Sequence, residues 1–181
     1  MRIKPDIPDE LLRTTLQNQY DLVPTTLEFL PVGLDYHAGV YRVVSEQGIA
    51  YLLKATSRPL YEPRYLVPRY LNDQGITSVV APLPTRSGGL WVKLVDWMVI
   101  VYPFIDGVSS FTGMTNEHWR NLGSIFKKIH QIIVPAELFQ SLRKETFDTS
   151  EYIRWIQAFE TQHLQSQHLL QPRHSRQLRQ I

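Results

Sequence analysis

The hydrophobic pattern of this chain changes once, near residue 107, and this change constrains the fold more than any other feature. Before it, short apolar runs alternate with turn residues, as in Val40–Ser45, Ile49–Lys54 and Trp97–Tyr102. After it, Thr115–Ile133 repeats apolar residues every three or four positions, the period of an amphipathic helix. Strands followed by helices predict an α+β fold, in which an antiparallel sheet with a helix precedes a helical part.

The other elements before residue 107 follow from the same periods. Pro8–Tyr20 has acidic residues in its first turn and leucines on one side, which favours a helix. The turn at Gly48 joins two strands as a β-hairpin. The remaining predictions are strands at Thr25–Val32, Ser78–Ala81 and Gly89–Val95, and a helix at Tyr65–Asn72 that Gly75 ends, with Pro68 in its first turn or at a break.

The chain divides by pattern into three segments: 1–106 is a first lobe, 107–160 holds the first helices of a second lobe, and 161–181 is a biased tail. A helix is predicted at Thr149–Glu160 in the second segment. The tail contains no carboxylate and no aromatic residue. Such a composition fits a solvated basic helix, a disordered end or translation out of frame, and we rank the third interpretation first.

Charge and composition exclude several classes of protein. Residues 1–160 carry 16 basic and 17 acidic residues, a net charge of −1, so the body of the chain gives no reason to expect a nucleic-acid partner. The chain has no cysteine, which excludes disulfides and thiolate metal sites. It shows neither a signal peptide nor an apolar run that could cross a bilayer, so we expect no membrane partner and a cytoplasmic location.

A glycine-bearing loop, Gly33–Gly39, lies between the first two predicted strands. Its backbone N–H groups could approach phosphate oxygens, because glycine leaves no bulky side chain in the way. The loop lacks the GxxxxGK[ST] pattern, which excludes a P-loop. Taken alone, the loop is weak evidence for phosphate binding, since most such loops are hairpin turns.

Two further features follow the loop. Lys54 ends an apolar strand, where protein-kinase-like folds place the lysine that pairs with nucleotide phosphates. Glu62 is the only acidic residue between Lys54 and Asp73, which makes it the candidate partner of this lysine by elimination. The buried run Val99–Tyr102 then leads into Pro103–Gly107, whose free backbone groups beside an apolar slot would suit an adenine edge.

In this order, the features resemble the first half of the aminoglycoside phosphotransferase family, in particular its spectinomycin-phosphotransferase-like members. The resemblance covers about residues 25–133 and, more faintly, 145–160. The residues that carry it are the run Gly33-x-Asp35-x-x-Ala38-x-Val40-Tyr41-Arg42-Val43, YLLK ending at Lys54, VPRYL at 67–71, APLPT at 81–85, YPFIDG at 102–107 and LGxxFxxIH ending at His130.

The resemblance implies a protein-kinase-like N-terminal lobe, followed by the start of a truncated helical C-terminal lobe. It implies that ATP binds with its phosphates against Lys54 and under loop 33–41, and with its adenine on the Pro103 carbonyl and the Ile105 N–H. The nucleotide-binding residues are then Gly33, Asp35, His37, Ala38, Gly39, Lys54, Glu62, Pro103 and Ile105. In the full-length family, a small-molecule hydroxyl group accepts the phosphoryl group.

Phosphoryl transfer also requires a catalytic Asp, an Asn and a metal-binding Asp. In the family these lie in an HGD…N loop and a later acidic segment. None of the six histidines here begins a His-x-Asp sequence, and no carboxylate follows Glu160. We therefore predict no catalytic and no metal-binding residue, with Mg²⁺ bound only if the rest of the helical lobe is supplied. The alternatives are a pseudokinase-like nucleotide-binding or partner-docking module and, on three tail arginines, a nucleic-acid or membrane-surface adaptor.

Overall fold

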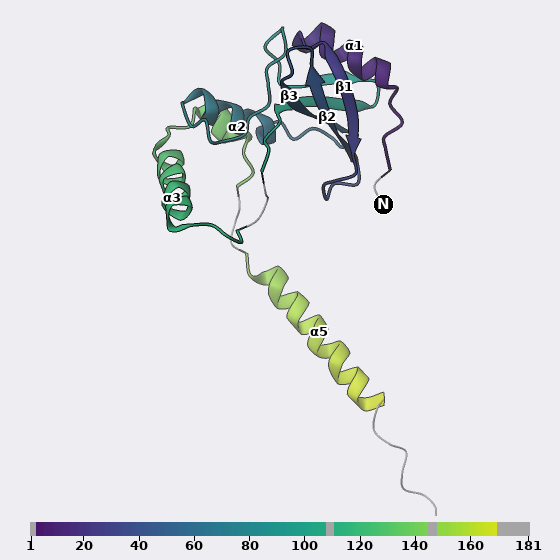
Figure 1. Cartoon of the computed structure of the whole chain (residues 1–181). Helices are drawn as coiled ribbons and strands as arrows, with labels where there is room; N and C mark the ends of the chain where they lie inside the picture. The colour runs from purple at the N-terminus through teal and green to yellow at the C-terminus, as the bar shows by residue number, and fades with distance from the viewer. Residues whose placement is uncertain (1–2, 108–110, 145–147, 170–181) are drawn as a thin grey trace, which may run out of the picture. The chain divides into compact units, whose positions relative to one another are not determined.

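The computed structural model describes residues 3–107, 111–144 and 148–169, and the side chains of the last helix only as far as residue 161 (Figure 1). The chain forms two compact units, Met1–Leu142 and Arg143–Ile181. The helices of the first unit are α1 (Asp9–Tyr20), α2 (Pro63–Asp73), α3 (Asn116–Gln131) and α4 (Ala136–Ser141), and the second unit contains α5 (Ser150–Leu169). Within the described residues, no helix is long and apolar enough to span a membrane.

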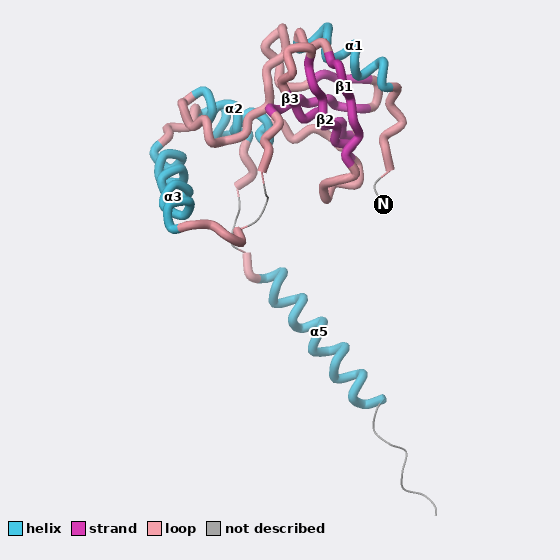
Figure 2. Tube along the Cα trace, in the orientation of Figure 1, coloured by secondary structure: helices cyan, strands magenta, loops and turns pink. Residues whose placement is uncertain are grey.

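The sheet is antiparallel throughout, with the strand order β1-β2-β3-β5-β4. Figure 2 shows the strands together beside α1 and α2. Their bounds are β1 (Pro24–Leu30), β2 (Ala38–Ser45), β3 (Ala50–Thr56), β4 (Val92–Leu94) and β5 (Trp97–Pro103). The predicted hairpin is confirmed: Gly48 has φ +75° in the turn between β2 and β3, a conformation that glycine adopts without strain.

Two apolar clusters cover the two faces of the sheet. On one face, Leu12 and Leu16 of α1 pack with Tyr41, Leu53 and Val101, all fully buried. On the other face, Tyr65 of α2 packs with Ile100 and Leu90. Because successive strand residues point to opposite faces, the odd-numbered residues of β3 meet α1 and the even-numbered residues face α2. We call this second side the α2 face.

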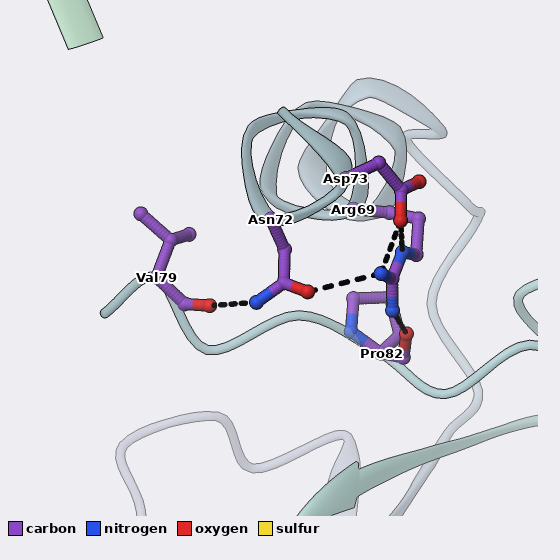
Figure 3. Close-up of polar contacts among 5 residues, drawn as sticks. All are labelled: Arg69, Asn72, Asp73, Val79 and Pro82. Carbon is purple, nitrogen blue, oxygen red and sulfur yellow. Dashed lines mark hydrogen bonds and ion pairs between the residues drawn. The ribbon is translucent and has the colours of Figure 1, made fainter. Parts of the chain in front are cut away.

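Helix α2 corrects the prediction for Pro68. Pro63 occupies the first turn of the helix, and Pro68 lies inside it, with no break. Tertiary contacts hold this helix in place despite the lost hydrogen bond. Arg69 pairs with Asp73 and donates hydrogen bonds to Asn72 Oδ1 at 3.0 Å and to the Pro82 carbonyl at 3.5 Å (Figure 3).

The segment Ser78–Ala81 forms no strand, contrary to the prediction. Its backbone is bound instead by a side chain, because Asn72 Nδ2 donates to the Val79 carbonyl at 3.1 Å (Figure 3). Further along, the Leu83 N–H donates to the Val101 carbonyl at 2.7 Å. The loop therefore runs from α2 to the outer edge of β5 without joining the sheet ladder.

The predicted helix at Thr115–Ile133 is confirmed as α3. Thr115 caps it as predicted: its hydroxyl accepts a hydrogen bond from the His118 N–H, and His118 Nδ1 accepts from the Thr115 N–H. No residue of α3 is buried, and Trp119 and Phe126 are 49% and 53% exposed. The sequence did not predict α4.

The second unit contains the predicted helix at Thr149–Glu160, which extends beyond the predicted end. Residues 161–169 of the biased tail continue α5 to Leu169, and residues 170–181 lie outside the described residues. The apolar side chains Trp155 and Phe159 of α5 are exposed.

Candidate functional site

Lys54 lies in the central part of the sheet, on the α2 face. Its strand neighbours are Val40 of β2 and Ile100 of β5, and Ile100 packs against α2. The Lys54 side chain is 24% exposed, so its ammonium group is held near an apolar surface and still reached by solvent. Leu52 and Tyr102 face the same side of the sheet and are partly buried.

The loop between β1 and β2 reaches this lysine through Asp35. One carboxylate oxygen of Asp35 lies 3.5 Å from Lys54 Nζ, and the other lies 3.2 Å from Arg58 Nε. The His37 N–H donates to the same carboxylate at 3.2 Å. Although partial burial acts in the opposite direction, these contacts with His37, Lys54 and Arg58 lower the pKa of Asp35.

The lowered pKa of Asp35 predicts a dependence of stability on pH. Its contribution to folding is present above the unfolded-state pKa of about 4 and is lost as the pH falls through the lower pKa of the folded state. We expect Asp35→Asn to reduce the free energy of unfolding at pH 6 and to have much less effect at pH 3. Urea unfolding of both proteins at the two pH values measures this, and an equal difference at both would contradict the assignment.

The predicted partner of Lys54, Glu62, is not its ion-pair partner in the structure. Glu62 stands at the N-cap of α2, and in the described part of the chain Lys54 pairs with Asp35. With Arg69, Glu62 lines a pocket of about 520 Å³ between α2 and α4. The prediction was wrong because Glu62 is the nearest carboxylate after Lys54 in the sequence, whereas the carboxylate that pairs with the lysine comes from the loop before β2.

Helix α2 presents Tyr65 to the α2 face. Burial raises the pKa of Tyr65, while the neighbouring Arg64 lowers it and the nearby Asp35 charge raises it. Burial also raises the pKa of Tyr102, to which the proximity of Tyr65 contributes. The site thus combines a lysine and two arginines with two neutral tyrosines. Sequence reasoning missed Arg58, Arg64 and Tyr65 because no motif marks them.

The other residues of the predicted loop have distinct places. Gly33 has φ +96°, which favours glycine, and the Ala38 N–H donates to the Asp35 carbonyl at 3.1 Å. The His37 carbonyl accepts from the Ser57 N–H at 3.0 Å, which fixes the end of the loop against the end of β3. His37 itself is exposed.

Gly39 is buried for a packing reason. A Cβ atom at this position would lie 2.3 Å from Pro5 Cγ, a distance at which one of the two must move. Gly39 pairs with Ala55, whose side chain belongs to the core on the α1 side of the sheet. The structure therefore gives this glycine a contact away from Lys54, in addition to any part in the loop.

The predicted hinge begins where β5 ends. The Phe104 N–H donates to the Ala50 carbonyl at 3.2 Å. Tyr51 and Pro103 then face each other at a position without mutual hydrogen bonds, so the Pro103 carbonyl points to the outer edge of β5. On the same edge, the Val101 carbonyl already accepts from Leu83.

Ile105 follows in an exposed segment beyond the end of β5, and among the described residues no hydrogen-bond partner is found for its N–H. Arg42 lies over the Phe104 ring, 5.3 Å from its centroid. The Pro103 carbonyl and the Ile105 N–H thus stand next to each other at the end of the strand that borders Lys54, beside an aromatic and apolar surface.

In the described residues, no three His, Cys, Asp or Glu side chains gather as they would around a metal ion. Asp35, which is bound to two cations, is the carboxylate beside Lys54.

The chain was compared with protein-family models, curated proteins and solved structures. No protein-family model and no curated protein matches the chain. Solved structures do: a spectinomycin phosphotransferase in complex with ADP and spectinomycin has a TM-score of 0.76 and 29% identity over 87% of this chain and 48% of the other. Its AMP-bound complex has a TM-score of 0.71 and 27% identity over 84% of this chain and 46% of the other.

An amicoumacin kinase in complex with AMP-PNP, Ca²⁺ and Ami shares the fold, with a TM-score of 0.54 and 21% identity over 92% of this chain and 55% of the other. The chain thus spans about half the length of the solved structures that it matches. The resemblance to the N-terminal part of aminoglycoside and spectinomycin phosphotransferases is confirmed, and so is the kinase-like N-terminal lobe.

Proposed function

We propose that this chain, whose fold is the N-terminal lobe of aminoglycoside-phosphotransferase-type kinases, binds an adenine nucleotide on the α2 face of its sheet. One observation carries the proposal. Three parts lie along one face: a lysine on the central strand, a loop between β1 and β2 that reaches it through Asp35, and the end of β5, where the Pro103 carbonyl points outward and the Ile105 N–H follows. In kinases these parts hold the phosphates and the adenine.

Each residue has a role in this proposal. The Pro103 carbonyl accepts a hydrogen bond from the adenine amino group, and the Ile105 N–H donates to a ring nitrogen. Leu52 and Tyr102 supply apolar surface under the base. Lys54 binds the phosphates, and loop 33–41 covers them. The spectinomycin phosphotransferase structures with ADP and with AMP support a nucleotide ligand for this fold.

The molecule that accepts the phosphoryl group concerns the whole enzyme rather than this chain alone. The spectinomycin phosphotransferase is bound to spectinomycin, which carries hydroxyl groups, so a small-molecule hydroxyl acceptor is the substrate class that we propose. The chain spans about half of that protein, and we assign it the nucleotide-binding part on the geometry around Lys54. We propose that the 181-residue chain alone transfers no phosphoryl group.

The test of nucleotide binding is a titration with ADP by isothermal calorimetry. Lys54→Met is expected to weaken ADP binding at least about tenfold, since it removes a charge contact of ~1.4 kcal/mol or more. Lys93→Met, on the exposed edge strand β4, is the matched control and should leave the affinity unchanged. Equal losses in both variants, or no ADP binding by the unchanged chain, would refute the proposal.

A further inference from the structure

Two cations converge on one carboxylate beside the proposed phosphate position. Lys54 and Asp35 are each 24% exposed and lie 3.5 Å apart, while Arg58 is 55% exposed and lies 3.2 Å from the second Asp35 oxygen. The carboxylate thus takes up the charge and hydrogen-bonding groups that a phosphate would need. A carboxylate and a phosphate are both anionic oxygen acceptors that bind lysine and arginine in the same way.

We propose that Asp35 is an anionic latch, which occupies the phosphate position on Lys54 and Arg58 until a nucleotide displaces it, and that Arg58 is a second phosphate-binding residue. The inference rests on the proposed nucleotide binding. It adds Asp35 as a competitor of the phosphate and Arg58 as a second residue that binds it. A phosphate and the Asp35 carboxylate on the same two cations repel each other, so one must leave.

The anchors of the loop indicate which part moves. The Ala38 N–H is bound to the Asp35 carbonyl at 3.1 Å, and the His37 carbonyl is bound to the Ser57 N–H at 3.0 Å. These bonds hold the loop backbone at its junction with β2. The side chain of Asp35 can turn away without breaking either of them, at the loss of the hydrogen bond that its carboxylate accepts from the His37 N–H at 3.2 Å. The latch therefore opens by rotation of one side chain.

The latch acts only on ligands that carry phosphate. Adenosine binds through its base and needs no displacement of Asp35, whereas ADP must compete with it. Removing the carboxylate charge therefore strengthens ADP binding and leaves adenosine binding unchanged. Removing the Arg58 charge weakens ADP binding and again leaves adenosine unchanged. The ratio of the two affinities also cancels any general effect of a substitution on folding.

The experiment measures ADP and adenosine binding to the full 181-residue chain in EDTA, by calorimetry. Asp35→Asn and Asp35→Ser are expected to tighten ADP binding by about tenfold, equivalent to ~1.4 kcal/mol, and Arg58→Gln to weaken it by a similar factor. The matched controls are Asp96→Asn, in the exposed turn between β4 and β5, and Arg86→Gln, also exposed. Both should bind ADP and adenosine as the unchanged chain does.

The outcomes separate the latch from the proposed function. If the chain binds adenosine and ADP but Asp35→Asn leaves their ratio unchanged or weakens ADP, the latch is wrong and nucleotide binding stands. Weaker ADP binding by Asp35→Asn with Mg²⁺ present would instead make Asp35 a metal ligand and also overturn the latch. If neither ligand binds the unchanged chain, the proposed function fails and the latch with it.

Discussion

Leu53→Ala is expected to lower the free energy of unfolding by about 3 kcal/mol or more, the effect of removing a large side chain from a closed core. Leu53 is fully buried between Tyr41 and Val101 on the neighbouring strands and packs in the cluster that α1 covers. The cavity left behind has walls from three strands and a helix, which cannot all move inward. Urea unfolding followed by circular dichroism measures the loss.

Leu52 is the matched control for this substitution, because it is the same residue type one position earlier on β3 and faces the other way. It is only partly buried. Leu52→Ala should cost much less stability than Leu53→Ala and should weaken adenosine binding, because Leu52 lies under the proposed base. Similar stability losses in the two variants would mean that the alternation of faces along β3 is wrong.

The 181-residue chain is expected to phosphorylate spectinomycin no faster than the uncatalysed reaction, a deficit of about 10⁶-fold or more relative to a complete enzyme. None of its histidines begins a His-x-Asp sequence that would supply a catalytic base. Among the described residues, no three His, Cys, Asp or Glu side chains gather at one place. Most of the rate enhancement in phosphoryl transfer comes from charged groups held in position around the reacting atoms. Binding of ATP alone does not replace those groups.

The assay is transfer of labelled phosphate from ATP to spectinomycin with Mg²⁺ present, with Lys54→Ala as the background control. Equal amounts of labelled product from the two proteins would agree with the prediction that the 181-residue chain transfers no phosphoryl group. Magnesium-dependent transfer that disappears in Lys54→Ala would show that the chain holds a base that its sequence pattern does not reveal.

Apart from the strand expected at Ser78–Ala81 and the helix α4, the order of strands and helices could be predicted from the sequence, since it depends on local periods. The unbroken apolarity of Trp97–Tyr102 predicted a strand buried on both faces, and β5 carries three fully buried residues in its middle. The short strand β4 was placed within the longer predicted segment Gly89–Val95. Lys54 was recognised at a strand end, although β3 continues two residues beyond it.

The parts that the sequence did not predict depend on contacts between distant residues. Pro68 remains within α2 because Arg69 and Asn72 bind the loop that follows the helix. Asp35 lies 19 residues before its partner Lys54 and meets it only because β1, β2 and β3 pair in sequence. No local pattern distinguishes such a carboxylate from any other polar residue of a hairpin loop.

An amide NMR titration of the chain with ADP shows where the nucleotide binds. We expect the largest shift changes at the Ile105 N–H, in residues 33–41 and at Lys54, with little change along α1 on the opposite side of the sheet. Shift changes confined to α1, or to the pocket between α2 and α4, would show that nucleotide does not bind on the α2 face.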